Sequence, residues 1–167
     1  TYLGRRFRGV DYYHAGLKAE ERTKVQEAYN AGDVRILVAT NAFGMGIDHP
    51  DVRLVAHFQM PANIDSLYQE MGRAGRDGRD STCLMLYSKK DKGLQSYFIQ
   101  NSGAPAQIKR SRYNTLEALV SYAEGGEGRH GEILTYDQDS FRLDHCGHCD
   151  TCLPASPRKI LRPVVAD

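Results

Sequence analysis

Two arginines near the middle of the chain have the type and the spacing to hold phosphate groups. Arg73 and Arg76 lie three residues apart in the run QEMGRAGRDG, residues 69–78, and a glycine precedes each of them. On a helical turn this spacing places both guanidinium groups on one side, where each can donate two hydrogen bonds to phosphate oxygens. The glycines leave room beside the backbone, and the acidic Glu70 and Asp77 are expected to hold the arginines in position. The pattern indicates a grip on a triphosphate like that of an arginine finger, and the alternative is a solvated charged turn that ends a helix.

A second polar segment follows a short apolar run. Residues 34–39 read VRILVA, which favours a buried strand, and Thr40, Asn41 and a loop with two glycines come next, before Asp48. Open α/β sheets place ligands at the carboxyl ends of their strands, so these polar side chains are candidates for binding. The alternative is a structural turn in which Asp48 caps a helix.

A third group is a cluster of cysteines near the carboxyl end. Cys146, Cys149 and Cys152 form a C-x-x-C-x-x-C run, a spacing that suits one tetrahedral Zn²⁺ better than a disulfide framework and is typical of a reducing compartment. Cys83 falls in an apolar run and is predicted to be a core residue. The alternative for the cluster is a set of free thiols.

The elements that must position these residues alternate between strands and helices. Apolar patterning predicts strands over residues 10–14, 36–39, 52–58 and 82–87, and helices over 19–31, 64–73, from about 91, and over 106–124. This alternation predicts an α/β fold, with a parallel sheet flanked by helices. The composition changes near Ser88, so we expect domains at residues 1–88 and 89–154, followed by a tail or linker at 155–167.

Together these segments resemble a known family. The runs AFGMGID (residues 42–48) and GRAGRDG (residues 72–78) are similar to motifs V and VI of superfamily 2 helicases, and to the RecQ family of DNA helicases in particular. The resemblance extends from about Tyr12 to Tyr87 and includes YHAGL at residues 13–17, with Pro61, Ile64, Tyr68 and Gln69. It implies most of a RecA-like second motor lobe, followed by a small helical zinc-binding subdomain. The sequence contains no G-x-x-x-x-G-K-[ST] loop, so the resemblance also implies that a first lobe lies outside it.

The resemblance assigns roles at the nucleotide site. ATP with Mg²⁺ would lie between the two lobes, with Arg76 as the arginine finger and Arg73 as its companion. Gln69 would help position water or phosphate. Gly46 would contact the nucleotide, and Asp48 would contact the nucleotide or link its state to the DNA site.

The resemblance also assigns roles at the DNA. His14, Thr40 and Asn41 would hold the backbone of single-stranded DNA, and Arg110 or Arg112 would touch DNA from the zinc-binding subdomain. Arg110 and Arg112 form a basic cluster with Lys109. The alternative is that this cluster is only a solvated face of the helix.

The zinc site departs from the family pattern. The family has a fourth cysteine at the position of Gly128 in this chain. We expect His130 to supply the fourth ligand. The alternatives are His145 or His148, or a weak or empty site whose fourth position is taken by water.

Composition is compatible with this function without indicating it. The 167 residues are 41% hydrophobic and 26% charged, with a net charge of +1, and no apolar run is long enough to span a bilayer. The resemblance implies part of an ATP-dependent 3′–5′ DNA helicase of repair and recombination, inactive as an isolated chain. Its partners would be single-stranded and forked DNA and the first lobe, in the cytoplasm at the bacterial nucleoid or in a nucleus. The rival functions are a translocase or RNA helicase of the same superfamily and a non-catalytic, zinc-bearing nucleic-acid-binding module.

Overall fold

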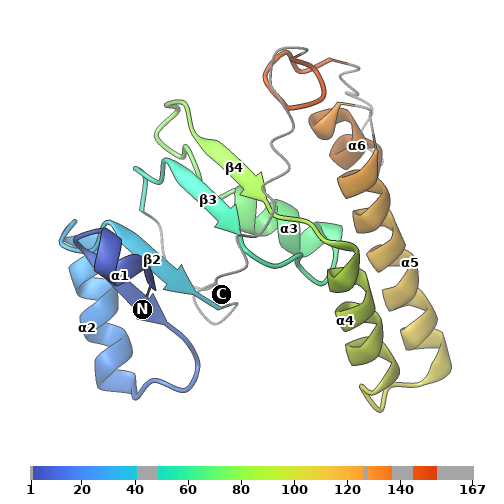
Figure 1. The fold of residues 1–167 in the computed structure, drawn as a ribbon, viewed down its shortest axis with the longest axis horizontal. Helices are drawn as coiled ribbons and strands as arrows, with labels where there is room; N and C mark the ends of the chain where they lie inside the picture. The colour runs from blue at the N-terminus through green and yellow to red at the C-terminus, as the bar shows by residue number, and fades with distance from the viewer. Residues whose placement is uncertain (1, 41–48, 126–127, 137–144, 154–167) are drawn as a thin grey trace, which may run out of the picture. The chain divides into compact units, whose positions relative to one another are not determined.

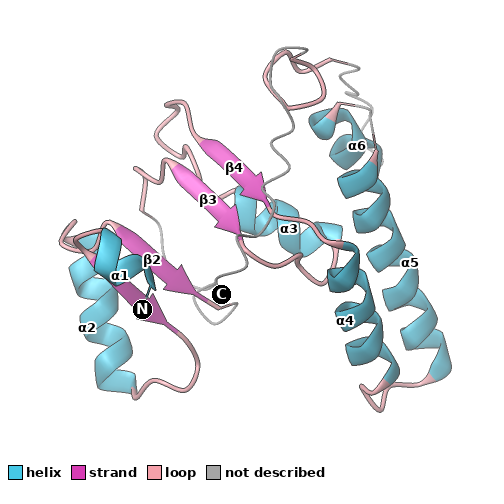
Figure 2. Ribbon diagram, viewed as in Figure 1, coloured by secondary structure: helices cyan, strands magenta, loops and turns pink. Residues whose placement is uncertain are grey.

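The computed structural model describes residues 2–40, 49–125, 128–136 and 145–153, which form short strands and longer helices (Figures 1 and 2). In chain order the elements are α1 (Tyr2–Arg6), β1 (Val10–Tyr13), α2 (Ala19–Asn30), β2 (Ile36–Ala39), β3 (Leu54–His57), α3 (Ile64–Met71), β4 (Thr82–Met85), α4 (Lys89–Gln100), α5 (Ala106–Glu124) and α6 (Arg129–Tyr136). The chain divides into two compact units, Thr1–Val55 with Glu70–Cys83, and Ala56–Gln69 with Leu84–Asp167. No helix among the described residues is long and apolar enough to cross a membrane.

The first unit is built on the parallel pair β1 and β2, which α2 connects. Val10 pairs with Ile36 and Tyr13 with Ala39, so the two strands end at the same edge. Helix α2 begins with a capping box, in which Glu21 accepts a hydrogen bond from the Lys18 backbone N–H at 2.9 Å. The segment after α2 leads into β2, and Val34, two residues before that strand, is the buried apolar residue among the described residues of this unit.

Strands β3 and β4 form a second parallel pair. The Thr82 N–H donates to the Arg53 carbonyl at 2.9 Å, and four residues further along both strands the Leu86 N–H donates to the His57 carbonyl at 2.9 Å. Helix α3 lies between these strands in sequence, so β3, α3 and β4 form a strand–helix–strand unit.

The second unit is mainly helical. Helices α4 and α5 run antiparallel side by side (Figure 1) and are tied at three levels: by Lys92 to Glu117, by Tyr113 to the Ser96 carbonyl and by Lys109 to the Gln100 carbonyl. Among the described residues of this unit, the buried apolar ones are Met60, Ile64, Leu67, Ile99, Leu116, Leu119, Val120, Tyr122 and Ile133. Their burial fixes α3, α5 and α6 around one core.

The predicted α/β class with parallel strands is confirmed, and α5 has the predicted bounds. The described strands form two separate two-stranded sheets; β2 has the predicted bounds, whereas β1, β3 and β4 are shorter than predicted. The prediction that the helix starting at residue 64 continues to Arg73 was wrong. It ends at Met71, because the Arg73 and Ala74 amides bond the carbonyls three residues back and the chain enters tight turns at Gly72. Helices α1 and α6 were not among the predicted elements.

Candidate nucleotide, nucleic-acid and metal sites

The two arginines of the predicted phosphate grip lie on consecutive turns beyond α3. Arg73 is half-buried, Arg76 is exposed, and the Arg76 Nε donates to the Gly72 carbonyl at 3.1 Å. Gly75, between them, has φ of +66°, and a Cβ there would lie 2.7 Å from Ser81 Oγ. The expectation that this glycine leaves room for a ligand therefore needs correction, since its space is filled by the returning chain.

Asp77 has a partner that the sequence did not reveal. Its Oδ2 lies 2.6 Å from Arg53 Nη2, and its Oδ1 accepts from the Arg79 N–H at 3.1 Å. The hydrogen bond from Arg53 holds the pKa of Asp77 below its ordinary value, so this carboxylate stays charged at neutral pH. Asp77 belongs to the turn that carries Arg73 and Arg76, called the arginine turn below. Its ion pair connects this turn to Arg53, which lies 24 residues earlier in the chain.

The candidate DNA-binding residues His14 and Thr40 follow β1 and β2 directly. The Thr40 N–H donates to the Tyr13 carbonyl at 3.1 Å, which continues the strand pairing and brings both residues to one sheet edge. His14 Nδ1 accepts from the Gly16 N–H at 3.1 Å, and its ring stacks on Tyr12. Both residues thus stand at one sheet edge, and an imidazole and a hydroxyl are groups that can hydrogen-bond to phosphate.

The remaining candidates are on helices or outside the described residues. Gln69 is exposed near the end of α3, and Arg110 and Arg112 are exposed on α5. Asn41, Gly46 and Asp48 lie outside the described residues.

The three cysteines of the C-x-x-C-x-x-C run converge. Their sulfur atoms lie within 4.8 Å of one another, and Cys146 Sγ lies 3.8 Å from Cys152 Sγ. Sulfurs bound to one tetrahedral Zn²⁺ at about 2.3 Å are separated by about 3.8 Å, so the arrangement fits this ion. Among the described residues, these three form the group that can hold a metal ion, and His130 is not part of it.

Hydrogen bonds favour the thiolate form of one of these cysteines. Burial alone would raise the pKa of Cys149, but the Thr151 hydroxyl and the backbone N–H groups of Arg129 and Cys152 outweigh it and lower the pKa to about 5. Burial raises the pKa of Cys83, whose Sγ lies 3.7 Å from the Met71 carbonyl. Cys83 therefore favours the neutral thiol, and the prediction that it is a core residue was wrong, because Cys83 is exposed on β4.

A second unpredicted ion pair ties the cysteine run to the helices. Arg129 forks onto Asp150, with Nε–Oδ1 of 2.9 Å and Nη2–Oδ2 of 3.0 Å, and its Nη1 donates to the Tyr122 carbonyl. This places the first turn of α6, and so the buried Gly128, beside the cluster. His130 is exposed on that turn, with its ring centroid 6.1 Å from that of His148. The one sign of this ion pair in the sequence is the acidic Asp150, which lies between Cys149 and Cys152.

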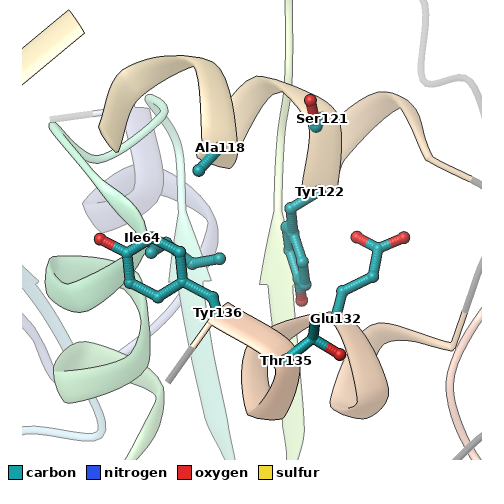
Figure 3. Close-up of a pocket in the computed structure, with 7 residues that line it drawn as sticks. All are labelled: Ile64, Ala118, Ser121, Tyr122, Glu132, Thr135 and Tyr136. Carbon is teal, nitrogen blue, oxygen red and sulfur yellow. The ribbon is translucent and has the colours of Figure 1, made fainter. Parts of the chain in front are cut away.

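A pocket of about 310 Å³ lies between α5 and α6 (Figure 3). It is mainly apolar and has the Glu132 carboxylate on one side; its lining residues are Ile64, Ala118, Ser121, Tyr122, Glu132, Thr135 and Tyr136. Tyr136 donates to the Asp65 carboxylate at 3.1 Å, which links α6 to α3. The pocket contains none of the predicted site residues.

Comparison with known proteins assigns both parts of the chain. Residues 1–78 match the model of the helicase conserved C-terminal domain, and residues 89–153 match that of the RecQ zinc-binding region. The second match covers α4, α5, α6 and the cysteine cluster. The chain belongs to the RecQ family.

Curated RecQ relatives agree over most of the chain. The ATP-dependent DNA helicase Q5 of Rattus norvegicus is 42% identical over 92% of this chain and 17% of its own length. The ATP-dependent helicase SGS1 of Saccharomyces cerevisiae is 38% identical over 84% of this chain and 10% of its own, and the RecQ helicase of Bacillus subtilis is 38% identical over 84% and 23%. The chain thus spans less than a quarter of these relatives, and its RecQ region combines helicase-lobe and zinc-binding segments.

Proposed function

We propose that the chain is part of an ATP-dependent DNA helicase that moves 3′ to 5′ along one strand and unwinds duplex DNA in repair and recombination. Its membership of the RecQ family supports this function, because the named relatives are ATP-dependent helicases. The single structural observation that carries the proposal is the exposed Arg76 on a turn that hydrogen bonds and glycine packing hold in a defined shape.

In this proposal the arginine turn completes an ATP site that a first motor lobe begins. ATP is bound with Mg²⁺ by that lobe, and Arg76 approaches the γ-phosphate with Arg73 beside it. A guanidinium there stabilises the charge that develops on the transferring phosphoryl group. Gln69 orients water or phosphate, and Gly46 and Asp48 belong to the nucleotide side of the site.

The proposed DNA track follows the ends of β1 and β2. His14 and Thr40 are side by side there, and Asn41 is the next residue of the sequence. Arg110 and Arg112 on α5 would add contacts to phosphates of single-stranded or forked DNA. Such contacts follow the backbone and do not read the base sequence. The helicase would act where the DNA is, in the bacterial nucleoid or in a nucleus.

We also propose that Cys146, Cys149 and Cys152 hold a structural Zn²⁺, with His130 as the fourth ligand. The sulfur separations fit the ion, and His130 stands on the helical turn whose backbone N–H reaches Cys149. When bound, Zn²⁺ would cross-link the cysteine run and contribute folding energy to a small subdomain. Mass spectrometry should find one zinc per chain in the wild type and none in His130→Ala. Zinc retained by the variant would overturn the fourth-ligand assignment.

Steady-state hydrolysis by the full-length protein tests the helicase proposal. Arg76→Ala should lower the kcat of DNA-stimulated ATP hydrolysis by about 10³-fold, the effect expected of a lost arginine finger. Arg79→Gln is the matched control, because Arg79 is on the same loop with 78% of its side chain exposed. An Arg76→Ala protein that hydrolyses ATP at the wild-type rate would refute the proposed role.

Competition between nucleic acids tests the substrate. Unlabelled single-stranded DNA should displace a labelled DNA strand and stimulate hydrolysis, and RNA of the same sequence should do so far less well. Stronger stimulation by RNA would favour an RNA helicase of the same superfamily. Nucleic-acid binding without hydrolysis in the full-length protein would favour a non-catalytic binding module.

A further inference from the structure

Arg53, the residue just before β3, contacts two carboxylates and two backbone carbonyls. Its Nε lies 2.7 Å from Asp51 Oδ1, and its Nη2 lies 2.6 Å from Asp77 Oδ2. Its Nη1 donates to the Asp80 carbonyl at 3.1 Å, and its Nη2 also faces the Pro50 carbonyl at 3.4 Å. One guanidinium therefore joins the segment before β3 to the loop that follows the arginine turn.

Backbone bonds attach the same two segments. The Gly75 N–H donates to the Val52 carbonyl at 3.0 Å, and the Thr82 N–H donates to the Arg53 carbonyl at 2.9 Å. Gly75 is also packed so closely that an added Cβ would lie 3.0 Å from the Arg79 carbonyl oxygen. The loop between Gly75 and Thr82 is thus held at both ends, and Arg53 holds its middle.

The position of Arg76 depends on this attachment. Arg76 lies between Gly75, which bonds Val52, and Asp77, whose two carboxylate oxygens bond Arg53 and the Arg79 N–H. With both neighbours fixed, the Cα of Arg76 has little freedom. Arg79 contacts the same carboxylate only at 3.9 Å and with most of its side chain in solvent, so it cannot replace Arg53.

We propose that Arg53 is a positioning residue for the Arg73–Arg76 turn and acts on ATP hydrolysis through Asp77. This inference rests on the proposed function of Arg76. A catalytic group must be held within about 0.5 Å of its productive place, and a displacement of about 1 Å costs about 10²-fold in rate. Arg53 supplies this restraint from outside the nucleotide site, through an ion pair that spans 24 residues of sequence.

The test uses the full-length protein and separates kcat from KM. Arg53→Gln should lower the kcat of DNA-stimulated hydrolysis by about 10- to 100-fold, while the KM for ATP changes by less than about threefold, because Arg53 does not touch the nucleotide. Arg53→Lys keeps the charge but cannot bond Asp77 and the Asp80 carbonyl together, so it should restore part of kcat. Asp77→Asn should resemble Arg53→Gln, and the double variant should be no slower than either single one.

Three results would decide the inference. Wild-type kcat in Arg53→Gln, with Arg76→Ala inactive, would overturn the positioning role and leave the proposed function standing. Additive losses in the double variant would overturn the coupling between Arg53 and Asp77. Wild-type kcat in Arg76→Ala would instead overturn the proposed function itself. Rates are measured at a temperature well below the unfolding midpoint of each variant. Under this condition a residue that only stabilises the fold does not change kcat. The control variant Arg79→Gln should have the wild-type kcat.

Discussion

At the scale of single residues, the backbone of Gly75 decides how the arginine turn closes. Its φ of +66° lies in the left-handed region, and the returning chain at Arg79 and Ser81 fills the place of a side chain. Gly78 has a similar φ of +78°, but a Cβ there would meet nothing within 4 Å. Comparing substitutions at the two glycines therefore separates two contributions to the free energy of unfolding: the strain of a left-handed backbone and the steric overlap of an added Cβ.

Replacing each glycine with alanine should show this difference. Gly78→Ala should lower the free energy of unfolding by about 1 kcal/mol, the strain of a left-handed alanine. Gly75→Ala should lower it by about 3 kcal/mol, because overpacking adds to the same strain. Urea unfolding of both variants measures the difference, and equal losses would mean that the chain around Ser81 yields without cost.

Cys149 and Cys83 form a second matched pair of residues. The pKa of Cys149 is lowered to about 5, below the ordinary thiol value of about 8.5, whereas burial raises that of Cys83. In the metal-free chain, Cys149 should thus be alkylated by iodoacetamide at pH 7 well before Cys83, since the thiolate is the nucleophile. Peptide mass spectrometry after short exposures gives the order.

The same shift gives the sign of a pH dependence. A group whose pKa is lowered on folding stabilises the fold above its unfolded pKa and loses that contribution as the pH falls through the folded value. The hydrogen bonds to Cys149 should therefore stabilise the metal-free chain at pH 9 and cease to do so near pH 5. Alkylation of Cys83 before Cys149 at pH 7 would contradict both expectations.

At the scale of elements, the candidate functional residues gather where helices and strands end. His14 and Thr40 follow β1 and β2, the arginine turn follows α3, and the cysteine run meets the first turn of α6. Ends of elements expose backbone donors and carry side chains on loops that a rigid scaffold holds in place. For the cysteine run, the scaffold contact is the fork from Arg129 to Asp150.

Removing that fork should loosen the metal site. Asp150→Asn deletes a charge from a pair in which only 15% of the Arg129 side chain is exposed, and we expect zinc affinity to fall by about 10-fold. Competition with a chromophoric chelator measures the affinity. Glu117→Gln is the control, because its pair with Lys92 is largely exposed and should contribute little. Equal affinities in Asp150→Asn and the wild type would show that the cysteines hold the metal unaided.

At the scale of the whole molecule, apolar burial is uneven between the two units. Nearly all the buried apolar residues of the described chain lie in the helical second unit, and Val34 represents the first. In the first unit, Tyr12 and Val38 on β1 and β2 keep nearly half of their surface exposed. The strands of this unit therefore leave part of their apolar side chains in solvent.

The composite nature of the proposed ATP site leads to a prediction for the isolated chain. The chain supplies arginines but no phosphate-binding loop, so it should hydrolyse no ATP above background, with or without DNA. A coupled assay on the purified chain measures this, and the full-length protein serves as the positive control. DNA-stimulated turnover by the chain alone would refute the prediction.

The sequence by itself determined the alternation of strands and helices, the bounds of α5 and the cysteine cluster, because these follow from local spacing and periodicity, and its motifs carried the resemblance to the RecQ family. It did not locate the end of α3, where the turn at Gly72 overrides a pattern that continues to Arg73. Only the tertiary structure revealed the pairs of Arg53 with Asp77 and of Arg129 with Asp150. Their members stand 24 and 21 residues apart, and an ion pair at such a separation is decided by how the chain folds back.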